Sequence, residues 1–119
     1  IEAVILPGGM PGTLNLERSA KVNAFVDYAY ENQKLVCAIC AAPSILGHKG
    51  MLKGKKAVCF PGFESELEGA ELSDSFVVTD GNIITAKGMG SAVKFGIAIG
   101  AAFVGEAKMK KIEESLQCS

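Results

Sequence analysis

The segment that decides the fold is LVCAICAAP, residues 35–43. Its first five residues form an unbroken apolar run of strand length, which is typical of a strand buried on both faces of a parallel sheet. The run stops abruptly at Cys40, and Pro43 suits the first turn of a helix because its missing N–H is not needed there. The segment therefore predicts a buried strand that turns sharply into a short helix over residues 44–49, with Gly50 as its C-cap.

The residues before this segment predict a strand and a helix. Residues 3–6 (AVIL) are fully apolar and end at Pro7-Gly8-Gly9, which indicates an interior strand of a parallel sheet. Ser19 is a suitable N-cap for an amphipathic helix that ends near residues 32–34, and no helix is expected directly behind the glycines. The alternation of strand and helix favours a doubly wound α/β fold.

The residues after the segment predict a further strand and a hairpin. Residues 57–60 form a short apolar run, and the acidic stretch 63–72 is expected to be helix and loop. Two β-branched runs, 76–79 and 83–86, flank a turn with Asp-Gly chemistry, which is a hairpin signal. An apolar helix over 91–104 and an amphipathic helix over about 106–116 complete the prediction of a parallel sheet with an antiparallel edge hairpin.

The composition and charge of the chain limit the kinds of partner and the cellular location that can be expected. The chain has 119 residues, 49% of them apolar, and a net charge of −1, which fits one soluble domain and gives no reason to expect nucleic acid or membrane as a partner. There is no secretory signal pattern, and four cysteines in so apolar a chain are typical of reduced thiols, so a cytoplasmic location is expected. Because the sequence enters a strand at once, residues 1–119 are expected to be a single domain that lacks about 60 N-terminal residues.

Cys40 is the main candidate for chemistry. A residue at a sharp strand-to-helix turn is exposed at the carboxyl edge of the sheet, as in the nucleophile elbow of hydrolases. The helix N-terminus behind it favours a thiolate. The alternative is a small apolar residue that fits a tight turn, since unpaired cysteine is commonly buried. Position alone leaves both interpretations open.

Gly8-Gly9 also follows a strand. Glycine there would let backbone N–H groups approach a substrate oxygen, but an ordinary tight turn explains the pair equally well. The segment Gly88-Met89-Gly90 lacks the later glycine of a dinucleotide fingerprint, and no phosphate-binding loop is present. No cofactor is therefore expected.

Cys37 and Cys40 have C-x-x-C spacing, but Cys37 lies inside the strand and is expected to face away from Cys40. No cysteine or histidine cluster has metal-ligand spacing, so no metal is expected. His48 is placed two helical turns beyond Cys40, too far for a proton relay. Cys59 is interpreted as core filler and Cys118 as an exposed thiol near the C-terminus.

Three segments together, VILPGG at 4–9, AICAAP at 38–43 and TAKGMG at 85–90, resemble the DJ-1/ThiJ/PfpI superfamily in order and spacing. The resemblance implies a flavodoxin-like, class I glutamine amidotransferase-like domain that forms a homodimer, with Cys40 as the reactive thiolate. It further implies that the N–H groups of Gly9 and Ala41 form an oxyanion site. The family's acid–base glutamate would lie upstream of Ile1.

Departures from the family pattern narrow the function. PfpI-type peptidases have histidine directly after the nucleophile, where this chain has Ala41, and some relatives have histidine where this chain has Phe60 before Pro61. Class I glutamine amidotransferases need a distant downstream histidine and glutamate, and the only histidine after Cys40 is His48, which argues against that activity. The resemblance therefore implies a DJ-1/ThiJ-like enzyme of the glyoxalase III or deglycase type, whose substrate is a small reactive carbonyl. The alternative is an oxidative-stress sensor or redox chaperone in which Cys40 is oxidised.

Overall fold

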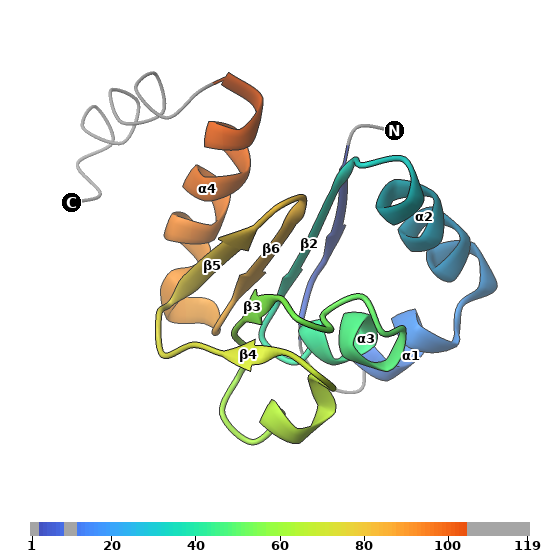
Figure 1. Cartoon of the computed structure of the whole chain (residues 1–119), viewed down its shortest axis with the longest axis horizontal. Helices are drawn as coiled ribbons and strands as arrows, with labels where there is room; N and C mark the ends of the chain where they lie inside the picture. The colour runs from blue at the N-terminus through green and yellow to red at the C-terminus, as the bar shows by residue number, and fades with distance from the viewer. Residues whose placement is uncertain (1–2, 9–11, 105–119) are drawn as a thin grey trace.

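The structure, a computed structural model, describes residues 3–8 and 12–104. One four-stranded sheet runs through it in the order β1-β2-β6-β5 (Figure 1). Strands β1 (Ala3–Leu6), β2 (Leu35–Ile39) and β6 (Ile83–Ala86) are parallel, and β5 (Val77–Asp80) pairs antiparallel with β6 at the edge. This confirms the predicted parallel sheet with an antiparallel edge hairpin. Asp80 pairs with Ile83, so the turn is Gly81-Asn82, and Gly81 has the positive φ of 62° that such a turn requires.

Helices cover both faces of this sheet. Helices α2 (Ala20–Glu31) and α4 (Ala92–Val104) lie on opposite sides of it (Figure 1). Val36 and Ala38 of β2 belong to the same buried cluster as residues of α2 and of α3 (Pro43–His48), whereas Cys37 packs in a second cluster with Phe95 of α4. Alternate residues of β2 therefore serve two cores, which is why its sequence is apolar without interruption.

Helix α1 (Gly12–Arg18) was not predicted. It contains only two large apolar side chains, Leu14 and Leu16, so it carries almost no periodic signal. Ser19 separates it from α2 and is the predicted N-cap, because its side chain accepts a hydrogen bond of 3.3 Å from the Val22 amide. Two short 3-10 helices, η1 (Glu64–Glu66) and η2 (Met89–Ser91), complete the helical elements of the described residues. None of the helices in this part of the chain is long and apolar enough to cross a membrane.

The prediction of a strand over residues 57–60 was largely wrong. Strand β3 covers only Lys56–Ala57 and pairs with β4 (Glu71–Leu72) in a separate two-stranded sheet. The amide of Val58 donates instead to the side chain of Thr85 at 3.0 Å, and the amide of Phe60 donates to the carbonyl of Cys40 at 2.8 Å. These long-range partners replace a strand ladder, so residues 58–60 run as a loop beside Cys40.

Strand β1 was predicted as an interior strand, but within the described residues it is an edge strand that pairs only with β2. Its central Ile5 is 52% exposed, as an edge position allows. The helix predicted over about 106–116 lies outside the described residues.

Candidate active site

Cys40 occupies a strained turn at the carboxyl end of β2. Its φ is +62°, in the left-handed region, which costs a residue with a side chain about 1–2 kcal/mol. Two backbone hydrogen bonds hold it there: its N–H donates to the Ala86 carbonyl at 3.0 Å, and its carbonyl accepts from the Phe60 amide at 2.8 Å. Strand β6 and the loop after β3 therefore fix the conformation that turns the chain from β2 toward α3.

Gly8, just beyond β1, forms one wall of the site. A Cβ atom on Gly8 would lie 2.2 Å from the Cys40 Cβ, 2.7 Å from the Ile39 carbonyl oxygen and 3.1 Å from the Cys40 sulfur. No side chain fits in that space. The end of β1 therefore approaches the elbow as closely as only a glycine backbone can.

Gly88, just beyond β6, forms the opposite wall. A Cβ atom there would lie 3.9 Å from the Cys40 sulfur and 3.4 Å from Cδ1 of Phe60. The loop is fixed by Ser91, whose buried hydroxyl accepts from the Gly88 amide at 3.1 Å and donates to the Gly88 carbonyl at 2.7 Å. Because β1 and β6 flank β2, the sulfur lies between two glycine backbones, with the Phe60 ring beside it.

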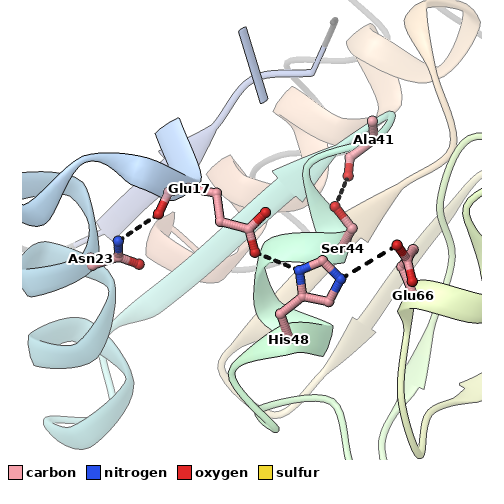
Figure 2. A network of polar contacts seen from close by, with 6 residues as sticks. All are labelled: Glu17, Asn23, Ala41, Ser44, His48 and Glu66. Atoms are coloured by element: carbon pink, nitrogen blue, oxygen red, sulfur yellow. Dashed lines mark hydrogen bonds and ion pairs between the residues drawn. The ribbon is translucent and has the colours of Figure 1, made fainter. Parts of the chain in front are cut away.

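Ala41 directly follows Cys40 and is 3% exposed. Its carbonyl accepts from the Ser44 hydroxyl at 2.7 Å (Figure 2), while the amide of Ala42 donates to the Ile39 carbonyl at 3.1 Å. No backbone hydrogen bond of the described residues uses the Ala41 N–H as donor. The role of this N–H as a donor to a substrate oxygen stays a prediction. Gly9, the other expected donor, lies outside the described residues.

The other described cysteines are buried, and burial raises the pKa of each thiol. Cys37 is fully buried, and loss of solvent raises its pKa to about 12. Burial, with a smaller contribution from the charge of Glu64, raises the pKa of Cys59 to about 11. Cys40 is only partly buried. Cys37 therefore does not act with Cys40 as an exposed dithiol pair, as expected from its place inside the strand, and Cys118 lies outside the described residues.

His48 ends α3 and is held by two carboxylates (Figure 2). Its Nδ1 lies 2.5 Å from Oε2 of Glu17 on α1, and its Nε2 lies 3.6 Å from Oε1 of Glu66 on η1. The hydrogen bond to Glu17 is the largest cause of a raised His48 pKa, partly opposed by desolvation. The chain's one histidine thus joins α1 to η1, and that it does not serve Cys40 stays a prediction.

Sequence analysis missed the roles of Gly88 and Phe60 in this site. From the sequence, Gly88 belongs to a segment of the family resemblance and to a rejected dinucleotide loop, and Phe60 belongs to a predicted strand and marks a departure from the family pattern. The usable signal was positional, because Gly88 directly follows the strand that the hairpin places next to β2. Within residues 3–8 and 12–104, no group of three or more His, Cys, Asp or Glu side chains is arranged to hold a metal ion.

The chain is similar to proteins of one family. The sequence model of the DJ-1/PfpI family matches residues 1–102. The protein dj-1beta of Drosophila melanogaster is 32% identical over 117 residues, which are 97% of this chain and 63% of that protein. Deglycase PH1704 of Pyrococcus horikoshii is 33% identical over 89 residues, 72% of this chain and 52% of that protein.

A solved structure shows the same fold. The DJ-1 superfamily protein STM1931 from Salmonella typhimurium superposes with a TM-score of 0.90 at 34% identity, covering 98% of this chain and 64% of that one. The chain thus spans a little under two thirds of dj-1beta and of STM1931, with 63% and 64% of their lengths covered. The match includes both the flavodoxin-like sheet and the segments that surround Cys40. The chain belongs to the DJ-1/PfpI family.

Proposed function

We propose that this chain carries the nucleophile of a DJ-1/ThiJ-like enzyme that acts on small reactive carbonyls, of the glyoxalase III or deglycase type. The observation that carries the proposal is the setting of Cys40. It is the only described cysteine that is not buried, and it is held at φ +62° with its sulfur between Gly8 and Gly88. The family relationship and the name of the Pyrococcus relative support this activity.

The proposed reaction converts a 2-oxoaldehyde and water into a 2-hydroxy acid. The Cys40 thiolate adds to the aldehyde carbon, and the Ala41 N–H stabilises the oxyanion that forms. A proton then moves from the former aldehyde carbon to the neighbouring carbon through an enediolate, which leaves a thioester. Water hydrolyses the thioester and releases the thiolate. One carbon is oxidised and its neighbour is reduced, so no external oxidant is needed.

The proton transfer needs a base, and His48 is committed to Glu17 and Glu66. We assign the role to a glutamate outside residues 1–119, as the family resemblance implies. A carboxylate in hydrogen-bond reach of the sulfur and of the adjacent carbon can serve both proton transfers. We also propose, from the same resemblance, that the protein is a homodimer, which sedimentation of the purified protein tests. The cysteine usage and the lack of a secretory signal pattern support the proposal of a cytoplasmic location.

Lactate formation from methylglyoxal by the full-length protein tests the activity. Cys40→Ser should abolish it, because serine at this site lacks a thiolate. Cys59→Ala, which removes a buried thiol, is the matched control and should retain activity, since Cys59 packs in the buried cluster that contains Val36 and Ala38. Equal rates for the wild type and Cys40→Ser would exclude the proposed reaction.

The difference between Cys40 and the other described cysteines also favours a second candidate, an oxidation sensor. Peroxide would convert the Cys40 thiolate to a sulfenic and then a sulfinic acid, while each peroxide is reduced to water. Peptide mass mapping after mild peroxide treatment should then find two added oxygens on Cys40 and none on Cys37 or Cys59. Oxidation of Cys40 together with an absence of lactate formation would favour the sensor over the enzyme.

A further inference from the structure

Phe60 is a large apolar side chain that stays 49% exposed beside the nucleophile. Two hydrogen bonds hold its backbone in place. Its amide donates to the Cys40 carbonyl at 2.8 Å, and its own carbonyl accepts from the Phe63 amide at 3.2 Å. In the described structure about half of the residue is in contact with solvent. An exposed ring fixed next to a reactive group is available for ligand contact.

The ring and the sulfur border the same space. The Cβ position of Gly88 is 3.4 Å from Cδ1 and 3.8 Å from Cε1 of Phe60, and 3.9 Å from the sulfur of Cys40. The Cβ position of Gly88 is therefore in van der Waals contact with both the ring and the sulfur, so the ring and the sulfur border the space next to Gly88. On the other side, Gly8 approaches the sulfur too closely to leave such room, with 3.1 Å between the sulfur and its Cβ position.

The geometry points to a substituent preference for this site, an inference that rests on the proposed function. When Cys40 attacks an electrophile, the substituent on the attacked molecule can lie next to Gly88, in the space that Cδ1 and Cε1 of Phe60 also border. We propose that Phe60 is a specificity-determining residue that makes the site prefer electrophiles with a flat, apolar substituent. In the proposed reaction the preferred substrates are aryl 2-oxoaldehydes, such as phenylglyoxal, over methylglyoxal.

Alkylation of Cys40 tests this preference without relying on turnover. The rate with N-phenylmaleimide is divided by the rate with N-ethylmaleimide, each followed at Cys40 by peptide mass mapping, and the quotient is compared with that of glutathione. An aromatic contact of ordinary strength should raise the protein's quotient about 2- to 12-fold above that of glutathione. Phe60→Ala should return it to the glutathione value.

Phe25→Ala is the matched control, because Phe25 on α2 is also 49% exposed and should leave the quotient unchanged. Should Phe60→Ala fail to fold, Phe60→Leu and Phe60→Tyr decide the question: leucine should lower the quotient and tyrosine should keep it. A wild-type quotient equal to that of glutathione, or one that Phe60→Ala or Phe60→Leu does not lower, overturns the inference.

Turnover separates this inference from the proposed function. The ratio of kcat/KM for phenylglyoxal to that for methylglyoxal should fall in Phe60→Ala, with methylglyoxal turnover retained. Turnover of both substrates with an unchanged ratio overturns the role of Phe60 and leaves the proposed function standing. If neither substrate is turned over but the alkylation quotient depends on Phe60, the proposed function is overturned and the role of Phe60 in the preference for aromatic substituents is supported.

Discussion

The amide of Phe60 donates a hydrogen bond of 2.8 Å to the carbonyl oxygen of Cys40. This bond joins a loop that carries an exposed aromatic ring to the strained residue that carries the thiol. On the other side, the Cys40 amide is bound to the Ala86 carbonyl at 3.0 Å. Changes in the loop or in β6 should therefore affect the geometry of the thiol as well as the stability of the domain.

Gly8→Ala should destabilise the protein strongly. The new methyl group would lie 2.2 Å from the Cys40 Cβ and 2.7 Å from the Ile39 carbonyl oxygen, so backbone must move. Overpacking of this kind typically costs about 1–3 kcal/mol, and urea unfolding measures it. Gly12→Ala is the control, because Gly12 lies in α1 with nothing within 4 Å of its Cβ position, and it should be neutral or stabilising. Equal stability of the two variants would contradict the close approach of β1 to the elbow.

Gly88→Ala should keep the fold and reduce the reactivity of Cys40. Its methyl group would meet Phe60 at 3.4 Å and the sulfur at 3.9 Å, which are ordinary contact distances, but it would occupy the space above the loop. Bulky reagents should lose more rate than small ones, so the alkylation rate with N-phenylmaleimide should fall more than the rate with iodoacetamide. A uniform loss with both reagents, together with an unfolding midpoint below that of the wild type, would indicate a distorted loop rather than a filled space.

Thr85→Val should weaken the loop that carries Phe60. Thr85 is fully buried, and its Oγ1 accepts from the Val58 amide at 3.0 Å. Valine has nearly the same shape but leaves that buried amide without an acceptor, which typically costs about 1–3 kcal/mol. Thr79→Val, at an exposed position of β5, is the control and should change the free energy of unfolding little. Similar losses in both variants would show that the hydrogen bond contributes no more than general strand packing does.

His48 should make part of the stability depend on pH. Its folded-state pKa is raised above the ordinary value of 6.5, chiefly by the hydrogen bond to Glu17. The pair therefore stabilises the fold fully below the unfolded-state pKa, and this contribution is lost as the pH rises through the folded-state pKa. Since the side chains are partly exposed, the effect should be at most about 1 kcal/mol.

The measurement is urea unfolding at pH 6 and pH 9. Glu17→Gln should lower the free energy of unfolding at pH 6 and change it much less at pH 9. Glu31→Gln, at the exposed end of α2, should show no such difference between the two values of pH. A loss from Glu17→Gln that is the same at both would mean that the His48–Glu17 contact acts without the histidine charge.

The sheet was predictable because its strands carry strong local patterns. The apolar run of β2 and the β-branched runs that flank Gly81-Asn82 identify their strands without knowledge of the rest of the chain. The N-cap at Ser19 was equally local. The loop at residues 58–60 was not predictable, because its amides bind Thr85 and Cys40, whose positions depend on the completed sheet.

The candidate site was predictable only in part, for the same reason. Cys40 stands out in the sequence because a strand, a turn and a proline follow one another around it. The walls at Gly8 and Gly88 come from strands on either side of β2, so their contact with the sulfur depends on strand order. Ala41 was expected only from the family resemblance, whereas the exposed ring of Phe60 required the tertiary structure.

The positive φ of Cys40 lowers the stability of the domain, and the same backbone conformation holds the thiol in the candidate site. Glycine would adopt this conformation without strain, so Cys40→Gly should unfold at higher urea concentration than Cys40→Ala, although neither has a sulfur. The native residue is thus the one that gives up folding free energy, about 1–2 kcal/mol, in order to hold a thiol at the end of the sheet. A version of this domain selected only for stability would replace Cys40 with glycine and would lose the nucleophile that we propose.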